Sequence, residues 1–282
     1  MISLVQLGTV DYATGLRLQE QLVALRKEEK IGDVLLLLEH KPVITLGRNA
    51  KAANVIASPE LLARRGVELF ECDRGGDVTF HGPGQIVGYP IFDLRGFVTP
   101  DGKRKTLGAV EFVRRLEEVL IRTCADFAIP TKRVLGLTGV WTNPDVATSY
   151  VGTAASAVPR SEASAPEHAS EAKLAAIGVH ISRFVTSHGF ALNVNTDLNF
   201  FDLIIPCGIK AKPVTSMQQE LGKPLDLNAV AESISRNFST VFSSQMLWVD
   251  TLDTLPGNAV GIPLQRPAEF RQLHKEDDTT WA

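Results

Sequence analysis

The residues of this chain that could do chemistry gather in a few short stretches, and the densest is RGGDVTFHGPGQ at 74–85. It contains four glycines. Glycine has no Cβ, so the backbone of such a loop can approach a bound carbonyl or phosphate closely, while Arg74, His81 and Gln85 add directional polar contacts. The same residues also suit a long glycine turn with an arginine ion pair and a structural histidine. Residue types alone leave both interpretations open.

Cys207 and Lys173 are two further candidates. Proline before Cys207 and glycine after it predict a tight, rigid turn at the end of an apolar strand, which would present the thiol to a pocket. Lys173 begins the apolar stretch KLAAIGV. A free cysteine is also common in protein cores, and a lysine at a strand end often reaches water. Cys124, on the apolar face of a helix, and Cys72, at a strand end, are predicted to be structural.

The elements that must position these residues follow from the hydrophobic pattern. Apolar residues at helical spacing predict helices within 11–26, over 113–127 and after Asp226, which would be an N-cap. Short β-branched or apolar runs predict strands at 34–38, 43–46, 67–70, 78–80, 86–94, 139–141, 174–181 and 190–194. This order, with hairpin-like connections, predicts an α+β fold with a mixed β-sheet flanked by helices.

Composition narrows the class of protein. The 282 residues carry 29 Lys and Arg against 32 Asp and Glu, and no basic run that would bind nucleic acid. The N-terminus lacks a signal-peptide pattern and the longest apolar run, Val34–Leu38, is too short to span a bilayer. We therefore expect a cytoplasmic protein that binds neither nucleic acid nor membrane. Three cysteines without a CxxC pair predict no disulfide framework and no metal site.

Length and local composition predict one domain over residues 1–250. At about 142–172, Ala, Ser and Pro supply 16 of 31 residues. So little apolar surface cannot offset the entropy of ordering the chain, so this stretch is predicted to be a flexible insert within a hairpin. Residues 251–282 are expected to form a C-terminal extension.

Several blocks of sequence together resemble the lipoyl(octanoyl) transferase family. They are RGGDVTFHGPGQIVGYPIFDL at 74–94, GVW at 139–141, KLAAIGV at 173–179, HGFALNVNTDL at 188–198 and IIPCGI at 204–209, with LEHKPVITLGR at 38–48 similar to the N-terminal block. Lys41 and Ile44 depart from the pattern, because many relatives have a proline and an aromatic residue there. The insert also lengthens a hairpin that is normally short.

The resemblance implies an acyltransferase that moves octanoyl from octanoyl-acyl carrier protein to a lysine of lipoyl domains, the first step of endogenous protein lipoylation. The acceptors would be the lipoyl domains of 2-oxoacid dehydrogenase complexes and the glycine cleavage H protein. It also implies a biotin/lipoate protein ligase-like fold and no cofactor. Cys207 would carry the octanoyl group as a thioester, and Lys173 would activate it. The implied substrate-binding residues are Arg74, Gly75, Gly76, Asp77, Val78, Thr79, Phe80, His81, Ala176, Ile177, Gly178, His188, Gly189 and Phe190.

The implied chemistry suits these residue types. Acyl exchange between two thioesters is nearly isoenergetic, so the intermediate stays reactive toward an amine. Only the thiolate attacks, and an ammonium beside Cys207 would lower the thiol pKa from its free value of about 8.5. Backbone amides at the glycines of the site could hold the tetrahedral oxyanion.

Two other functions fit part of the pattern. An ATP-dependent lipoate-protein ligase shares the fold and a glycine-rich block, but it adenylates the free acid and needs no catalytic cysteine. Asp77 stands where such ligases tend to have another glycine. A non-catalytic module that binds lipoyl domains or acyl carriers would keep the pocket and lose the nucleophile.

Overall fold

The computed structural model describes residues 1–97, 106–144, 171–206, 212–252 and 255. Cys207, most of the predicted insert and most of the predicted C-terminal extension lie outside these residues. No helix within these ranges is long and apolar enough to cross a membrane.

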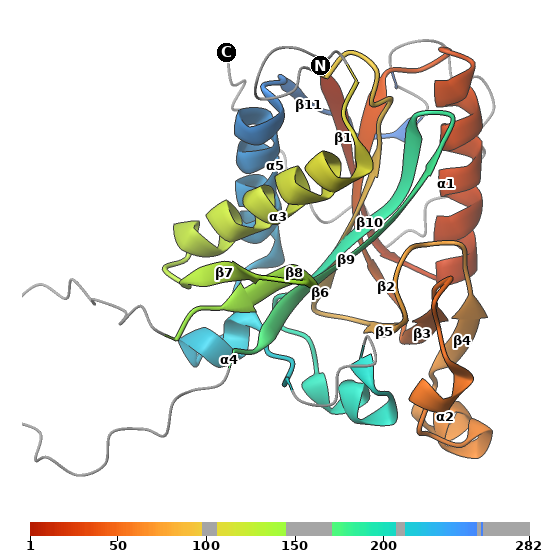
Figure 1. Ribbon diagram of the computed structural model, residues 1–282, viewed down its shortest axis with the longest axis vertical. Helices are drawn as coiled ribbons and strands as arrows, with labels where there is room; N and C mark the ends of the chain where they lie inside the picture. The colour runs from red at the N-terminus through yellow and green to blue at the C-terminus, as the bar shows by residue number, and fades with distance from the viewer. Residues whose placement is uncertain (98–105, 145–170, 207–211, 253–254, 256–282) are drawn as a thin grey trace, which may run out of the picture.

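The chain is built around a mixed eight-stranded sheet (Figure 1). In spatial order its strands are β11 (Met246–Trp248), β1 (Ile2–Val10), β2 (Asp33–His40), β6 (Gln85–Ile91), β10 (Val185–Asn193), β9 (Lys173–Ser182), β8 (Leu137–Thr142) and β7 (Thr131–Val134). β1 runs parallel to β11 and β2, and every other neighbouring pair is antiparallel. The predicted α+β fold with a mixed sheet is confirmed.

Helices cover both faces of this sheet. Leu35 and Leu37 of β2 pack in one core with α3 (Ala109–Asp126) and α5 (Leu227–Phe242), whereas Leu36 and Leu38 pack in another with α1 (Tyr12–Lys27). Successive side chains of a strand point to opposite faces, so a strand covered on both sides reads as an unbroken apolar run. Asp226 is the N-cap of α5, as predicted, and accepts a hydrogen bond from the Asn228 amide.

A smaller sheet packs at one end of the large one. Its order is β4 (Glu68–Glu71), β3 (Val43–Leu46) and β5 (Val78–His81). Three short helices, η1 (Ala52–Asn54), α2 (Pro59–Arg65) and η2 (Leu198–Leu203), lie around it, while α4 (Met217–Leu221) precedes α5. The glycine-rich stretch 74–85 begins in the loop from β4 to β5, continues through β5 and ends at the first residue of β6.

The sequence that follows the insert forms β9 and β10, and β9 takes part in two hairpins, one with β8 and one with β10. β9 and β10 are joined by Arg183 and Phe184, which both adopt positive φ, as a tight hairpin turn requires. The Thr142 amide donates to the Ala172 carbonyl and the Ala172 amide to the Thr142 hydroxyl, both at 2.9 Å. The ends of the insert therefore meet in the hairpin of β8 and β9, as predicted, with Thr142 already part of a strand.

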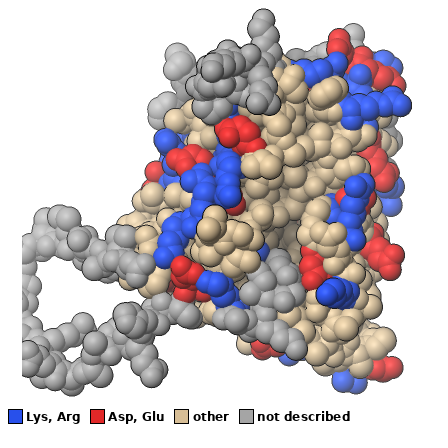
Figure 2. Space-filling view, viewed as in Figure 1, with Lys and Arg blue, Asp and Glu red and all other residues tan. Residues whose placement is uncertain are grey.

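Charged side chains gather over α3 and β7. Figure 2 shows Lys and Arg in a band across these elements, with Asp and Glu beside them. Within it, Arg122 and Arg133 pair with Glu118, and Arg114 and Arg133 pair with Glu117. The band is therefore a local network of ion pairs.

Candidate active site

A cleft lies between α1, β6, the β9–β10 hairpin and the loop from β4 to β5. Its empty volume is about 480 Å³, counted with the open solvent at its mouth. The lining residues are Tyr12, Arg74, Gly75, Gly76, Asp77, Thr79, His81, Val87, Tyr89, Ala176, Ile177, Gly178, His188, Gly189, Phe190 and Ala191. The structure thus brings every predicted substrate-binding residue to one cleft except Val78 and Phe80.

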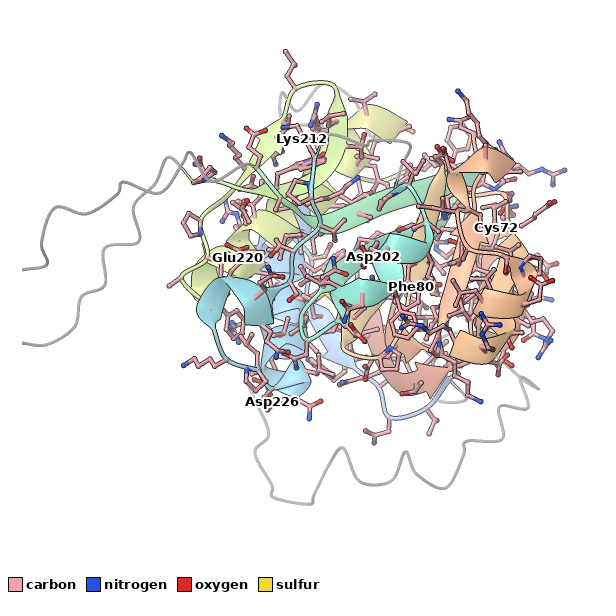
Figure 3. The ribbon with its side chains drawn as sticks, turned by 90° about the horizontal axis from the view of Figure 1, so that it is seen from below. Cys72, Phe80, Asp202, Lys212, Glu220 and Asp226 are labelled. Carbon is pink, nitrogen blue, oxygen red and sulfur yellow. The ribbon has the colours of Figure 1, made fainter. Side chains whose placement is uncertain are left out.

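Val78 and Phe80 face the other side of β5. Phe80 stacks on Phe200 with ring centroids 4.7 Å apart, and Figure 3 shows it beside η2, the helix that carries Asp202. Side chains alternate along a strand, so Thr79 and His81 reach the cleft while their two neighbours pack in the core of the small sheet.

Arg74 is folded back onto β3. Its Nη2 donates to the backbone carbonyl of Thr45 at 2.7 Å and to the Thr45 hydroxyl at 2.9 Å, and its Nη1 donates to the Gly75 carbonyl. The side chain is almost completely buried. Arg74 therefore holds the glycine-rich loop against the small sheet.

Glycines bring the loop close to β9. The Gly75 amide donates to the Val179 carbonyl at 3.1 Å, and a Cβ at Gly178 would lie 2.6 Å from the Gly75 carbonyl oxygen. Two backbones meet here with no room for a side chain. Because the Gly75 amide is already bonded to β9, it is not a free donor for an oxyanion, which differs from the role that the sequence suggested for it.

Two buried histidines are neutral: His81, which lines the cleft, and His40, which lies behind it against Tyr89. His81 Nδ1 donates to Gln85 Oε1 at 2.8 Å, because both hydrogens of that amide are directed to the Phe80 carbonyl and to Asn193 Oδ1. His40 accepts at Nε2 from the Tyr89 hydroxyl at 2.6 Å. Burial lowers the pKa of His81 to about 3 and that of His40 to about 4. The cleft therefore gains no positive charge from these rings at neutral pH.

His188 lies in β10, where the β9–β10 hairpin lines the cleft. Its backbone has φ of 54°, and its amide donates to Gln19 Oε1 at 2.7 Å. Its Nε2 is 2.7 Å from Asp73 Oδ1. Burial lowers the pKa of His188, although the hydrogen bond to Asp73 opposes this shift. His188 is therefore held through its backbone by Gln19 of α1 and through its ring by Asp73.

Lys173 lies at the start of β9 and is 9% exposed. Its amide donates to the Pro213 carbonyl at 2.8 Å, and its carbonyl accepts from the Thr215 amide at 3.0 Å. The chain that follows Cys207 therefore runs beside the lysine from residue 213 onward. Cys207 itself, the predicted nucleophile, lies outside the described residues.

The other two cysteines do not accompany Lys173. Cys124 is fully buried in the core between α3 and the sheet, where burial raises its pKa to about 12, so its predicted structural role is confirmed. Cys72 donates to the Leu46 carbonyl. In Figure 3, Cys72 lies far from Lys212. The ammonium groups of Lys212 and Lys173 both lie over the ring of Trp141.

Four residues of the cleft, Tyr12, Val87, Tyr89 and Ala191, were not among the predicted substrate-binding residues, although all but Tyr12 lie in the sequence blocks that resemble the transferase family. Val87 and Tyr89 are two residues apart in β6, so their side chains point to the same face of the strand, and this face meets the cleft. Tyr12 is the first residue of α1. Which face of β6 and which end of α1 meet the cleft depends on tertiary packing.

The fold and the cleft define a class of protein. The family model for the lipoyl protein ligase A/B catalytic domain matches residues 11–239, so the chain belongs to that family. The fold is shared with lipoate-protein ligase A bound with ATP (TM-score 0.60, 12% identity, 89% of each chain). It is also shared with a bipartite lipoate protein ligase from Thermoplasma acidophilum (TM-score 0.61, 13% identity, 89% of this chain and 87% of that one). The predicted likeness to lipoate ligases is confirmed.

Within the family, the similar curated proteins are octanoyltransferases. The chain is 55% identical to the octanoyltransferase of Koribacter versatilis over 98% of both chains. It is 53% identical to that of Acidobacterium capsulatum over 91% of this chain and 96% of the relative. The chain is accordingly an enzyme of the acyltransferase class, as the sequence resemblance predicted.

Proposed function

We propose that this enzyme takes octanoyl from octanoyl-acyl carrier protein, holds it as a thioester on Cys207 and transfers it to the lysine of a lipoyl domain. The observation that carries the proposal is the environment of Lys173. A buried lysine is hydrogen-bonded through its backbone to residues 213 and 215, soon after the Pro-Cys-Gly sequence at 206–208. An ammonium near a thiol favours the thiolate, which is the attacking form.

In the first half of the reaction, Lys173 takes the proton of Cys207. The thiolate attacks the octanoyl carbonyl carbon, a carbon–sulfur bond to Cys207 forms, and the bond to the carrier thiol breaks. The departing carrier thiolate receives the proton from the Lys173 ammonium. Octanoyl is then bound as a thioester of similar energy, so no activation by ATP is needed.

In the second half, the neutral amine of the acceptor lysine attacks the thioester of Cys207. The carbon–nitrogen bond forms, the Cys207 thiolate departs, and the nitrogen gives a proton to Lys173. The amide product leaves a thiolate and an ammonium that can begin a new cycle. The acceptor lysine loses its own ammonium proton to solvent before it attacks. These steps balance without a metal or a cofactor.

The cleft offers a place for the octanoyl chain. Val87, Ile177, Phe190 and Ala191 supply apolar wall, and the neutral state of His81 keeps a charge away from the alkyl group. Gly178 and Gly189, which pair across β9 and β10, line the same cleft with backbone and no side chain.

The proposed partners follow from the same reaction. A related fold was solved as an archaeal ligase of a lipoylation system together with its E2 lipoyl domain. This supports lipoyl domains of 2-oxoacid dehydrogenase complexes, and the lipoyl-carrying glycine cleavage H protein, as acceptors. We assign the activity to the domain formed by residues 1–250. A cytoplasmic location stays a prediction.

The test is the intact mass of the protein after it is mixed with octanoyl-acyl carrier protein in the absence of ATP. The wild-type chain should gain one octanoyl group, and addition of a lipoyl domain should remove it. Cys207→Ser should abolish both the thioester adduct and turnover, and Lys173→Ala should slow both steps. Cys124→Ala is the matched control and should retain the adduct. An undiminished rate in Cys207→Ser would refute the mechanism. Octanoylation of the lipoyl domain only when free octanoate and ATP are supplied would indicate a ligase.

A further inference from the structure

The indole ring of Trp141 lies where two lysine side chains meet. Trp141 is in β8, is 1% exposed and is paired with Lys173 of β9. The Nζ of Lys173 lies 5.1 Å from the ring centroid, and the Nζ of Lys212 lies 5.5 Å from it. Both distances are within the range in which an ammonium is attracted to an aromatic face, and burial of the ring strengthens such an attraction.

The path of the Lys173 side chain depends on a glycine. Gly139 has φ of 123°, and a Cβ at this position would lie 2.8 Å from Lys173 Cε and 2.5 Å from the Ala175 carbonyl oxygen. The side chain of Lys173 therefore passes through space that any other residue at 139 would fill. The sequence Gly139-Val140-Trp141 thus supplies both a passage for the methylene groups and a face for the ammonium.

The charge of the second lysine is offset locally. Lys212 forms an ion pair with Glu171, and the other carboxylate oxygen of Glu171 is 3.0 Å from Lys132 Nζ. A neighbouring carboxylate weakens the repulsion that Lys212 would otherwise exert on Lys173 across the ring. Two cations can therefore lie near one indole ring.

We propose that Trp141 is a positioning residue for Lys173, and that its ring holds the ammonium in its orientation. The proposal rests on the function proposed above for Lys173. A ring with a negative face attracts the ammonium but has no such attraction for the neutral amine. Loss of that attraction would release the ammonium from this orientation. Alkylation of Cys207 would then need a higher pH, because an ammonium close to a thiol favours the thiolate.

The experiment replaces Trp141 site-specifically with tryptophan carrying one to four fluorine atoms. Fluorine withdraws charge from the ring face while the shape stays nearly unchanged. We expect octanoyl transfer at neutral pH to fall stepwise with each fluorine, by about 3- to 30-fold in total. The pH profile for alkylation of Cys207 by iodoacetamide should move upward in parallel, with the KM for octanoyl-acyl carrier protein unchanged. The same series at Trp248, which is 40% exposed in β11, is the control and should leave both readouts flat.

The Lys173→Ala background separates the proposal from a packing effect. There the fluorine series at Trp141 should have no effect on alkylation, because the Lys173 ammonium is gone and the Lys212 ammonium is paired with Glu171. Equal losses in both backgrounds, or a flat series in the wild-type background, would overturn the proposal. If Lys173→Ala itself leaves transfer and alkylation unchanged, the function proposed for Lys173 fails instead.

Discussion

Glu117 is a buried carboxylate that holds the backbone beside Lys173, and its replacement should destabilise the fold. It lies in α3 with no exposed surface, and three donors converge on its carboxylate. Oε2 accepts from Arg114 Nη1 at 2.6 Å and from Arg133 Nε at 3.1 Å, while Oε1 accepts from the Gly139 amide at 3.1 Å. Glu117 thereby ties α3 to the backbone of the residue that gives Lys173 its passage. We expect Glu117→Ala to lower the free energy of unfolding by about 2–6 kcal/mol and Glu117→Gln by about 1–2 kcal/mol.

These magnitudes follow from the three contacts. The Gly139 amide is buried, and leaving it without an acceptor costs about 1–3 kcal/mol. The arginine side chains are 44% and 35% exposed, so water replaces the carboxylate and each pair contributes only about 0.2–1 kcal/mol. Alanine also removes a buried methylene, worth about 0.8 kcal/mol. Glutamine keeps an acceptor for Gly139 and loses mainly the charge.

The assay is urea unfolding at pH 7 and constant salt, followed by far-UV circular dichroism. Glu118→Ala is the matched control, because Glu118 is the next residue of α3, also pairs with Arg133 and is 33% exposed. It should cost less than about 1 kcal/mol. The reasoning would be refuted if Glu117→Ala were no more harmful than Glu118→Ala, or if glutamine were as harmful as alanine.

Two further predictions concern pH and the insert. Burial lowers the pKa of His40 to about 4 and that of His81 to about 3, so below the unfolded value of about 6.5 the unfolded chain binds up to two protons that the folded chain does not. The free energy of unfolding should fall as pH drops from 6.5 to 5, and these two rings contribute a slope of at most about 2.7 kcal/mol per pH unit. Urea titrations of His81→Asn should show about half of that contribution lost, and an unchanged slope would contradict the assignment. Replacing residues 145–170 with a short Asn-Gly turn should leave acyl transfer nearly unchanged and stabilise the fold by about 1–2 kcal/mol, because closure entropy changes slowly with loop length. Two turns that differ by one residue should be compared, since loss of activity in both with intact folding would mean that the insert contributes to transfer.

The long elements could be predicted from the sequence because their signals are local. Apolar periodicity predicts α1, α3 and α5, and the N-cap of α5 is visible as Asp226. β1 was not predicted, because Gly8 at positive φ and a register shift between Gln6 and Thr9 interrupt the alternation of its side chains. β11 has only three residues, and none is fully buried, so no apolar pattern marks it.

The cleft was predicted from sequence resemblance better than from residue types. A contiguous motif does not separate the two faces of a strand, so Val78 and Phe80 were included with Thr79 and His81. Strand alternation alone would have divided these four. The contact of the glycine-rich loop with Val179 has no local signal, because it joins residues about a hundred positions apart.

The backbone bonds of Lys173 bear on how this family can change in length. Residues 213 and 215 hold both the amide and the carbonyl of Lys173, so the register of this segment against β9 is set at residue 214. Five residues separate Cys207 from Pro213, which makes the first of these bonds. An insertion or deletion in that interval would change the reach of the proposed nucleophile without moving the lysine. On the other side of Lys173, the hydrogen bonds between Thr142 and Ala172 close the hairpin whatever the number of residues between them. Length variation among related chains should therefore collect before Lys173 and be rare between 207 and 214.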